Sequence, residues 1–221
     1  MTKYTLQTDR QRGVLDLIGI YFSGTGNTKY CVEKFMQGYS SRAEALSIEE
    51  ENAAQRICEH SEIIIGYPVQ FSNIPKILKD FITDNSNVWN GRKVFVIATM
   101  GLFSGDGAGI LARLLTRYGA MIMGGLHLKM PDSIGDEKAL KRPLSKNREL
   151  VSKAEQKIER AVQELKNGRP TQDGMSFLNH LAGLFGQRLY FYNKVRSYSE
   201  QLSGNDFTEP ESLDITGFFK A

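Results

Sequence analysis

The chain has 221 residues, of which 41% are hydrophobic and 24% charged, and its formal net charge is +3. This length suits one sizeable α/β domain with an appendage, and the mild charge does not predict nucleic-acid binding. The two cysteines, Cys31 and Cys58, form no CxxC pair. That excludes an all-cysteine zinc site or an iron–sulfur cluster and argues against a disulfide scaffold. No run of about 18 apolar residues predicts a membrane span, so we expect a soluble cytoplasmic protein.

Strand-like apolar runs alternate with helical segments along most of the chain. In chain order the sequence predicts a strand over 14–22, a helix over 29–39, a strand near 43–48, a helix over 52–59, a strand over 61–69, a helix over 74–84, a strand over 93–101, a helix over 110–120, a strand over 121–130 and a charged helix over 145–166. This alternation predicts right-handed βαβ units, and hence an α/β fold with a parallel sheet covered on both faces. The Gly/Pro/Asp turn near 169–174 predicts a boundary between a domain over 1–168 and an extension over 169–221.

The first predicted strand ends in the loop YFSGTGNT, Tyr21 to Thr28. Ligands bind beyond the carboxyl ends of parallel strands, and the two glycines allow a backbone to approach a ligand closely. A helix begins directly afterwards, and its dipole favours an anion. No lysine follows as in a Walker loop and the spacing is not GxGxxG, so a phosphate monoester fits better than a triphosphate. The predicted phosphate residues are Ser23, Gly24, Thr25, Gly26, Asn27 and Thr28; the alternative is a plain glycine turn with a Ser/Thr helix cap.

This loop resembles the FMN phosphate loop of flavodoxin-like proteins, Ser/Thr-x-Thr-Gly-x-Thr, and matches it at every fixed position. The loop GYPVQFSN over 66–73 resembles the ring-flanking loop of flavodoxin-like NAD(P)H:quinone reductases, with matches at Pro68, Phe71 and Asn73. The segment MGLFSGDG over 100–107 lies where the second flavin loop belongs. The resemblance implies a doubly wound five-stranded sheet in the order 2-1-3-4-5 and FMN as the cofactor.

The two later loops are expected to frame the flavin ring, which needs an apolar slot with backbone donors and acceptors at its edge. Phe71 and Phe103 are candidates to stack on the ring, with core packing as the alternative. The predicted ring residues are Pro68, Val69, Gln70, Phe71, Ser72 and Asn73 from the first loop, and Met100, Gly101, Leu102, Phe103 and Gly105 from the second.

Over about 14–165 the chain is similar to the flavodoxin half of bacterial flavodoxin–ferredoxin fusion proteins. The CxxCxxCxxxCP motifs of the other half do not occur in this sequence. The resemblance therefore implies a separate redox partner, such as a ferredoxin-like protein. The only charged residue in the two ring loops is Asp106, so we expect a less negative hydroquinone potential than in acidic flavodoxins.

The remaining polar and sulfur-containing candidates predict no further site. His60, His127 and His180 are far apart in the sequence, without ligand spacing, so we predict no metal site; His127 is interpreted as a strand-end residue. Both cysteines are predicted to pack as small hydrophobic side chains.

The segment 177–202 predicts a helix with apolar side chains over about half of its circumference. Three hypotheses fit it: packing on its own domain, a partner surface such as a homodimer, and a helix lying on a membrane, which Arg188 and Arg196 disfavour.

Three functions follow as hypotheses. The first is an FMN-binding redox protein that carries one or two electrons. The second is an NAD(P)H-dependent quinone or flavin reductase, and the third is a phosphate-binding module without flavin.

Overall fold

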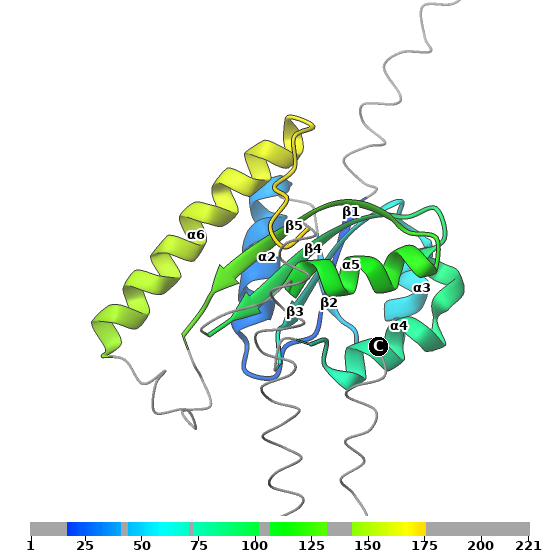
Figure 1. Cartoon of the computed structure of the whole chain (residues 1–221), viewed down its shortest axis with the longest axis horizontal. Coiled ribbons are helices and arrows are strands. Elements are labelled where there is room, and N and C mark those ends of the chain that lie inside the picture. The colour runs from blue at the N-terminus through cyan, green and yellow to red at the C-terminus, as the bar shows by residue number, and fades with distance from the viewer. Residues whose placement is uncertain (1–16, 41–43, 71–72, 102–106, 132–142, 176–221) are drawn as a thin grey trace, which may run out of the picture.

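The structure is a computed structural model that describes residues 17–40, 44–70, 73–101, 107–131 and 143–175. Its centre is a parallel sheet of five strands, flanked by helices on both faces (Figure 1). The strands are β1 (Leu17–Tyr21), β2 (Ala45–Ser47), β3 (Glu62–Pro68), β4 (Lys93–Met100) and β5 (Met121–Lys129). Their order is β2-β1-β3-β4-β5, which confirms the predicted flavodoxin-like fold class and strand order.

The helices between and after the strands also match the predicted pattern. They are α2 (Asn27–Tyr39), α3 (Ala53–Cys58), α4 (Lys76–Asp84), α5 (Gly107–Arg117) and α6 (Leu144–Lys166). Helix α5 begins three residues earlier than predicted, and a short 3-10 helix, η1 (Ser86–Trp89), was not predicted. The predicted helix over 177–202 lies outside the described residues. No helix in the described part of the chain is long and apolar enough to cross a membrane.

The strands separate two hydrophobic layers, because successive side chains of a strand point to opposite faces. Ile63 and Ile65 of β3 lie in the layer under α3, α4 and α5. Ile64, between them, lies in the opposite layer with the buried faces of α2 and α6. Since both faces are covered, the strands are apolar at nearly every position, and this explains why they appear in the sequence as continuous apolar runs.

Helix α2 lies close to the sheet because two strand glycines leave room for it. A Cβ on Gly66 of β3 would be 2.3 Å from Cγ2 of Val32, and a Cβ on Gly19 of β1 would be 2.8 Å from Cγ of Met36. Neither neighbour has space to move away, since Val32 and Met36 are buried. The two glycines therefore fix the height of α2 above β1 and β3.

The segment after α6 returns to the sheet and covers part of the free edge of β5. We call residues 171–175 the edge segment. The Gly125 N–H donates to the Thr171 carbonyl at 2.9 Å, and the Asp173 N–H donates to the Gly125 carbonyl at 2.9 Å. A Cβ on Gly124 would be 2.3 Å from the Thr171 carbonyl oxygen. The glycines that weaken this strand in the sequence are thus what admits the edge segment. The predicted domain boundary at 168–169 stays a prediction.

The prediction for the cysteines was half right. Cys31 is fully buried in α2, and burial raises the pKa of its thiol to about 12. Cys58, by contrast, is exposed, so the prediction that it packs as a core side chain was wrong. Ala53 and Ile57 form the buried side of the short helix α3. Cys58 is one residue beyond Ile57, a rotation of about 100° around the helix, which turns it to solvent.

Candidate functional site

The carboxyl ends of β1, β3 and β4 lie side by side in the sheet. Tyr21 of β1 is in register with Gly66 of β3, and Gly66 is in register with Ile97 of β4. The chain leaves β1 for β2 on one side and returns for β3 on the other, so the strand order reverses between β1 and β3. Doubly wound sheets bind ligands at this switch point. The three loops predicted to hold a ligand all begin here.

The first loop joins β1 to α2 through a glycine in the left-handed region. Gly26 has φ 91° and precedes the first residue of α2. Its N–H donates to Ser23 Oγ at 3.1 Å, and its carbonyl accepts the N–H of Tyr30 at 2.9 Å. Ser23 thus fixes the turn by accepting a hydrogen bond, which leaves its own O–H proton able to donate to a ligand.

The outer side of this loop is open. Gly24, Thr25 and Gly26 are exposed. A Cβ on Gly24 or Gly26 would meet no atom of the described chain within 4 Å. Because the first N–H groups of a helix have no acceptor inside the helix, the start of α2 presents donors to this open space. The arrangement suits a small anion at the helix N-terminus.

Two side chains predicted to face the phosphate make contacts within the protein. Asn27 Nδ2 donates to the carbonyl of Pro131 at 2.8 Å, just beyond the end of β5. Thr28 is only 1% exposed, and its Oγ1 lies 2.7 Å from Oγ1 of Thr99 on β4. Both contacts attach the first turn of α2 to the end of the sheet at which the carboxyl ends of the strands lie.

The second loop contains a tight turn. The Gln70 N–H donates to the Asn73 carbonyl at 3.1 Å, and the Asn73 N–H donates to the Gln70 carbonyl at 2.7 Å. Asn73 Oδ1 also accepts the N–H of Ile74 at 2.8 Å. Before the turn, the Val69 N–H donates to the Thr99 carbonyl at 2.8 Å, which attaches this loop to the end of β4. Phe71 and Ser72 lie outside the described residues.

The third loop is described only at its start. Met100, the last residue of β4, is 8% exposed, and its carbonyl accepts the N–H of Met130 at 2.8 Å. Gly101 follows and is half-buried. Leu102, Phe103 and Gly105 lie outside the described residues, as does Asp106. In the described part of the predicted site, residues 23–28, 68–70, 73 and 100–101, every side chain is uncharged.

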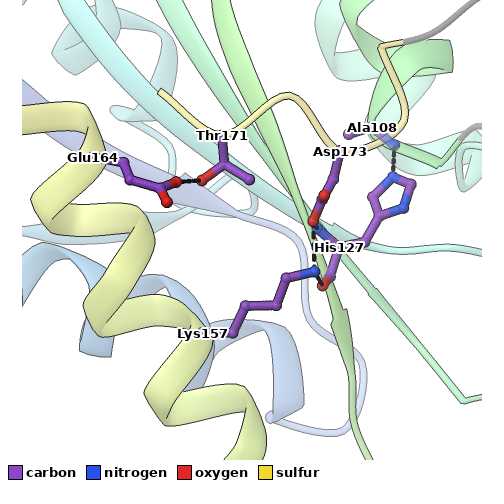
Figure 2. Close-up of polar contacts among 6 residues, drawn as sticks. All are labelled: Ala108, His127, Lys157, Glu164, Thr171 and Asp173. Atoms are coloured by element: carbon purple, nitrogen blue, oxygen red, sulfur yellow. Dashed lines mark hydrogen bonds and ion pairs between the residues drawn. The ribbon is translucent and has the colours of Figure 1, made fainter. Parts of the chain in front are cut away.

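Two residues that the sequence analysis did not place in the site fix the start of α5, directly after the third loop. The Tyr67 hydroxyl donates to the Gly107 carbonyl at 2.7 Å. His127 Nε2 lies 3.0 Å from the Ala108 nitrogen and accepts its N–H (Figure 2). His127 was predicted as a strand-end residue, and its position in β5 agrees with that. In the sequence, the only sign of this role was that His127 is a polar residue near the end of an apolar predicted strand.

His127 is itself surrounded by polar contacts from α6 and the edge segment (Figure 2). Asp173 Oδ2 accepts two hydrogen bonds, one from the backbone N–H of His127 at 3.0 Å and one from Nζ of Lys157 at 2.6 Å. Lys157 Nζ also donates to the His127 carbonyl at 2.9 Å. Burial raises the pKa of Asp173, but the hydrogen bonds from Lys157 and His127 outweigh it and hold that pKa below its usual value.

A second tie joins the same elements further along α6. Glu164 Oε2 accepts the hydroxyl proton of Thr171 at 2.6 Å (Figure 2). The edge segment is therefore held at two points, Thr171 and Asp173, by side chains of one helix. This arrangement ties α6 and the edge segment to β5, and His127 extends it to the start of α5.

The strand order defines a flavodoxin-like fold. Residues 18–116 match the family model described as Flavodoxin domain. A comparison with curated protein sequences finds no match.

Among solved structures, the chain is similar to several flavodoxins, and the likeness to one of them is enough to show a shared fold. Oxidised Flavodoxin 2 from Bacillus cereus superposes with a TM-score of 0.51 at 15% identity, over 69% of this chain and 98% of that one. Two-electron reduced flavodoxin from Megasphaera elsdenii gives a TM-score of 0.49 at 20% identity, over 66% of this chain and 98% of that one. Fusobacterium nucleatum flavodoxin bound to flavin mononucleotide gives a TM-score of 0.47 at 14% identity, over 68% of this chain and 97% of that one. At 15% identity the likeness to the Bacillus cereus protein concerns the fold alone. The predicted kinship with the fusion proteins stays a prediction.

Proposed function

We propose that this protein binds FMN and carries one or two electrons through the flavin. The observation that supports this most is the open glycine loop at the N-terminus of α2, placed at the switch point of the sheet. A second and a third loop begin beside it, as a ligand with both a phosphate and a ring requires.

The donor set fits the phosphate of FMN. A phosphate monoester carries up to two negative charges and only acceptor oxygens, so it needs donors and a favourable field. The described loop offers backbone N–H groups at a helix N-terminus and the hydroxyls of Ser23 and Thr25, without a charged side chain. A triphosphate with magnesium would call for a lysine and an acidic ligand, which this loop does not contain.

The chain's own residues would bind and orient the cofactor. In this proposal the loop 23–28 holds the phosphate, and the segments 68–73 and 100–105 border the ring. When bound, FMN supplies one- and two-electron chemistry at its isoalloxazine ring. We assign no acid or base to the protein, because the described site residues carry no titratable side chain.

Titration of the purified full chain with FMN and with riboflavin tests the proposal. We expect FMN to bind with quenched flavin fluorescence and a changed visible spectrum, and at least about tenfold more tightly than riboflavin, because riboflavin has no phosphate. Binding of inorganic phosphate without FMN would favour a flavin-free phosphate module and overturn the proposal.

A second candidate is an NAD(P)H-dependent quinone or flavin reductase on the same scaffold. The uncharged residues Pro68, Val69 and Gln70 beside the predicted ring site favour it, since they impose no repulsion on an anionic or neutral substrate. Steady-state NADPH oxidation with a quinone acceptor separates the two functions. Turnover would support the reductase. Electron transfer to a ferredoxin-like protein without NADPH turnover would support the carrier.

A further inference from the structure

Thr99 lies where the three loops of the proposed site meet. Its side-chain oxygen is 2.7 Å from that of Thr28 at the start of α2. Its carbonyl accepts the N–H of Val69 in the second loop at 2.8 Å, and Met100 follows it at the start of the third. One residue of β4 therefore contacts or precedes each of the three segments.

The contact between the two threonines is shielded from solvent. Thr28 is 1% exposed and Thr99 2%, and in the described part of the chain these are the two buried polar residues. A buried hydroxyl without a partner costs free energy, so each threonine depends on the other. Thr99 Oγ1 is also 3.5 Å from the Tyr67 carbonyl, which is long for a hydroxyl hydrogen bond. The Tyr67 carbonyl is therefore a weak substitute for Thr28.

Packing holds the other branch of the Thr28 side chain. A Cβ on Gly66 would be 3.1 Å from Thr28 Cγ2, so the methyl group lies against the sheet where β3 has no side chain. With the methyl on Gly66 and the hydroxyl on Thr99, both branches of this β-branched residue point into the protein. The Thr28 hydroxyl therefore does not face the open space above the loop.

The two partners differ in how firmly they are held. Thr99 lies in β4, which is hydrogen-bonded to β3 on one side and β5 on the other. Thr28 is the second residue of α2, in a first turn that begins at the exposed glycine loop. The sheet is thus the fixed reference, and the first turn of α2 is the part that the contact positions.

We propose that Thr99 is a positioning residue for the phosphate site: its hydroxyl anchors Thr28 and thereby fixes the backbone N–H groups at the start of α2. Thr28 then acts as an anchor and not as a direct phosphate ligand. This inference rests on the proposed function. It predicts that the two residues act as one unit.

A double-mutant cycle tests this with valine, which keeps the shape of threonine and removes the hydroxyl. We expect T99V and T28V each to weaken FMN binding by about five- to tenfold, and riboflavin binding by less than about twofold. The double variant is expected to be no weaker than either single variant, since both hydroxyls are then absent. T99S, which keeps the hydroxyl, is expected to bind FMN within about twofold of wild type.

Two further measurements keep the inference separate from the proposed function. Amide hydrogen exchange needs no ligand, and T99V is expected to increase exchange over 26–30, while T116V is not. Thr116 is the matched control, because its hydroxyl donates to the Ala112 carbonyl at 2.9 Å within α5. A wild type that does not bind FMN would defeat the proposed function. Additive losses in the cycle, or unchanged exchange in T99V, would overturn the positioning role alone.

Discussion

His127 Nε2 accepts the N–H of Ala108 at 3.0 Å, so a strand side chain caps the start of helix α5. The imidazole can do this only while Nε2 carries no proton, because a protonated ring has no acceptor. A positive charge would in addition oppose the dipole at this end of the helix.

We expect H127L to lower the free energy of unfolding by about 1–2 kcal/mol at neutral pH, as other lost helix caps do. Denaturant unfolding of both proteins measures the loss. H60L is the control, since His60 Nδ1 contacts the Arg56 carbonyl just beyond the C-terminal end of α3 and not at a helix start. An equal loss in both variants would contradict the capping role.

Asp173 makes the stability of the fold depend on pH. Burial raises its pKa, but the hydrogen bonds from Lys157 and His127 leave it below the ordinary value. A carboxyl whose folded pKa is lowered stabilises the fold above its unfolded pKa of about 3.9, and this is lost as the pH falls through the folded pKa.

We expect D173N to cost about 1 kcal/mol at pH 7 and to match wild type in strong acid. Denaturant midpoints across this range measure the effect. Asp80 serves as the control, because it forms an ion pair with Lys76 at 2.6 Å on the exposed surface of α4, and D80N should cost less than about 0.5 kcal/mol. A loss in D173N that does not change with pH would contradict the ionic contribution.

Gly66 is expected to tolerate no side chain. A Cβ there would be 2.3 Å from Val32 Cγ2, so G66A should lower the free energy of unfolding by about 1–3 kcal/mol and displace α2 from β3. Gly38, within α2, offers the matched control. Its added Cβ would be 3.4 Å from Val162 Cγ2, an ordinary contact, so G38A should stabilise the protein by about 0.5–1 kcal/mol. Thermal unfolding of both variants checks the signs, and a stabilised G66A would contradict the close approach.

The two cysteines should differ sharply in reactivity. Cys58 is exposed, whereas Cys31 is fully buried with its thiol pKa raised to about 12. Iodoacetamide should therefore modify Cys58 in the native protein and reach Cys31 only after denaturation, because the thiolate is the reactive form. Peptide mass spectrometry identifies the modified residue. Native labelling of Cys31 at a comparable rate would show that the α2–sheet layer opens.

The low charge of the two ring loops leads to a prediction for the proposed flavin. Residues 68–70 and 73 carry no charge, and neither do Met100 and Gly101. Low repulsion of an anionic hydroquinone should make it easier to form than in acidic flavodoxins. Reductive titration of the FMN-loaded protein measures the potential. A hydroquinone couple as negative as in acidic flavodoxins would contradict this account.

The sequence was sufficient to predict the sheet and the helices between the strands because each buried strand is a nearly unbroken apolar run. It did not indicate that the polar segment 171–175 pairs with β5. That contact depends on Gly124 and Gly125, which in a sequence only weaken a strand. The periodicity of apolar residues indicates which side chains are buried. It does not indicate which segment of the chain fills the space beside a glycine.

The position of the glycine loop at the N-terminus of α2 was also predictable, since the loop directly follows a buried strand. The side-chain partners of that loop were not. Asn27 contacts Pro131, 104 residues away, and Thr28 contacts Thr99, 71 residues away. Such contacts depend on which strands become neighbours, and local spacing carries no signal for them.

The pairing of the edge segment with β5 affects how truncated forms of the protein are expected to behave. An uncovered outer strand is a template on which other chains can add strands and aggregate. At the opposite side the sheet ends in β2, which has only three residues, so β5 is the longer outer strand. Cutting the chain at Gly168 would remove Thr171 and Asp173 and expose the part of β5 that the edge segment covers. Truncations made to study the C-terminal region should therefore keep the chain through Met175, so that the edge segment still covers β5.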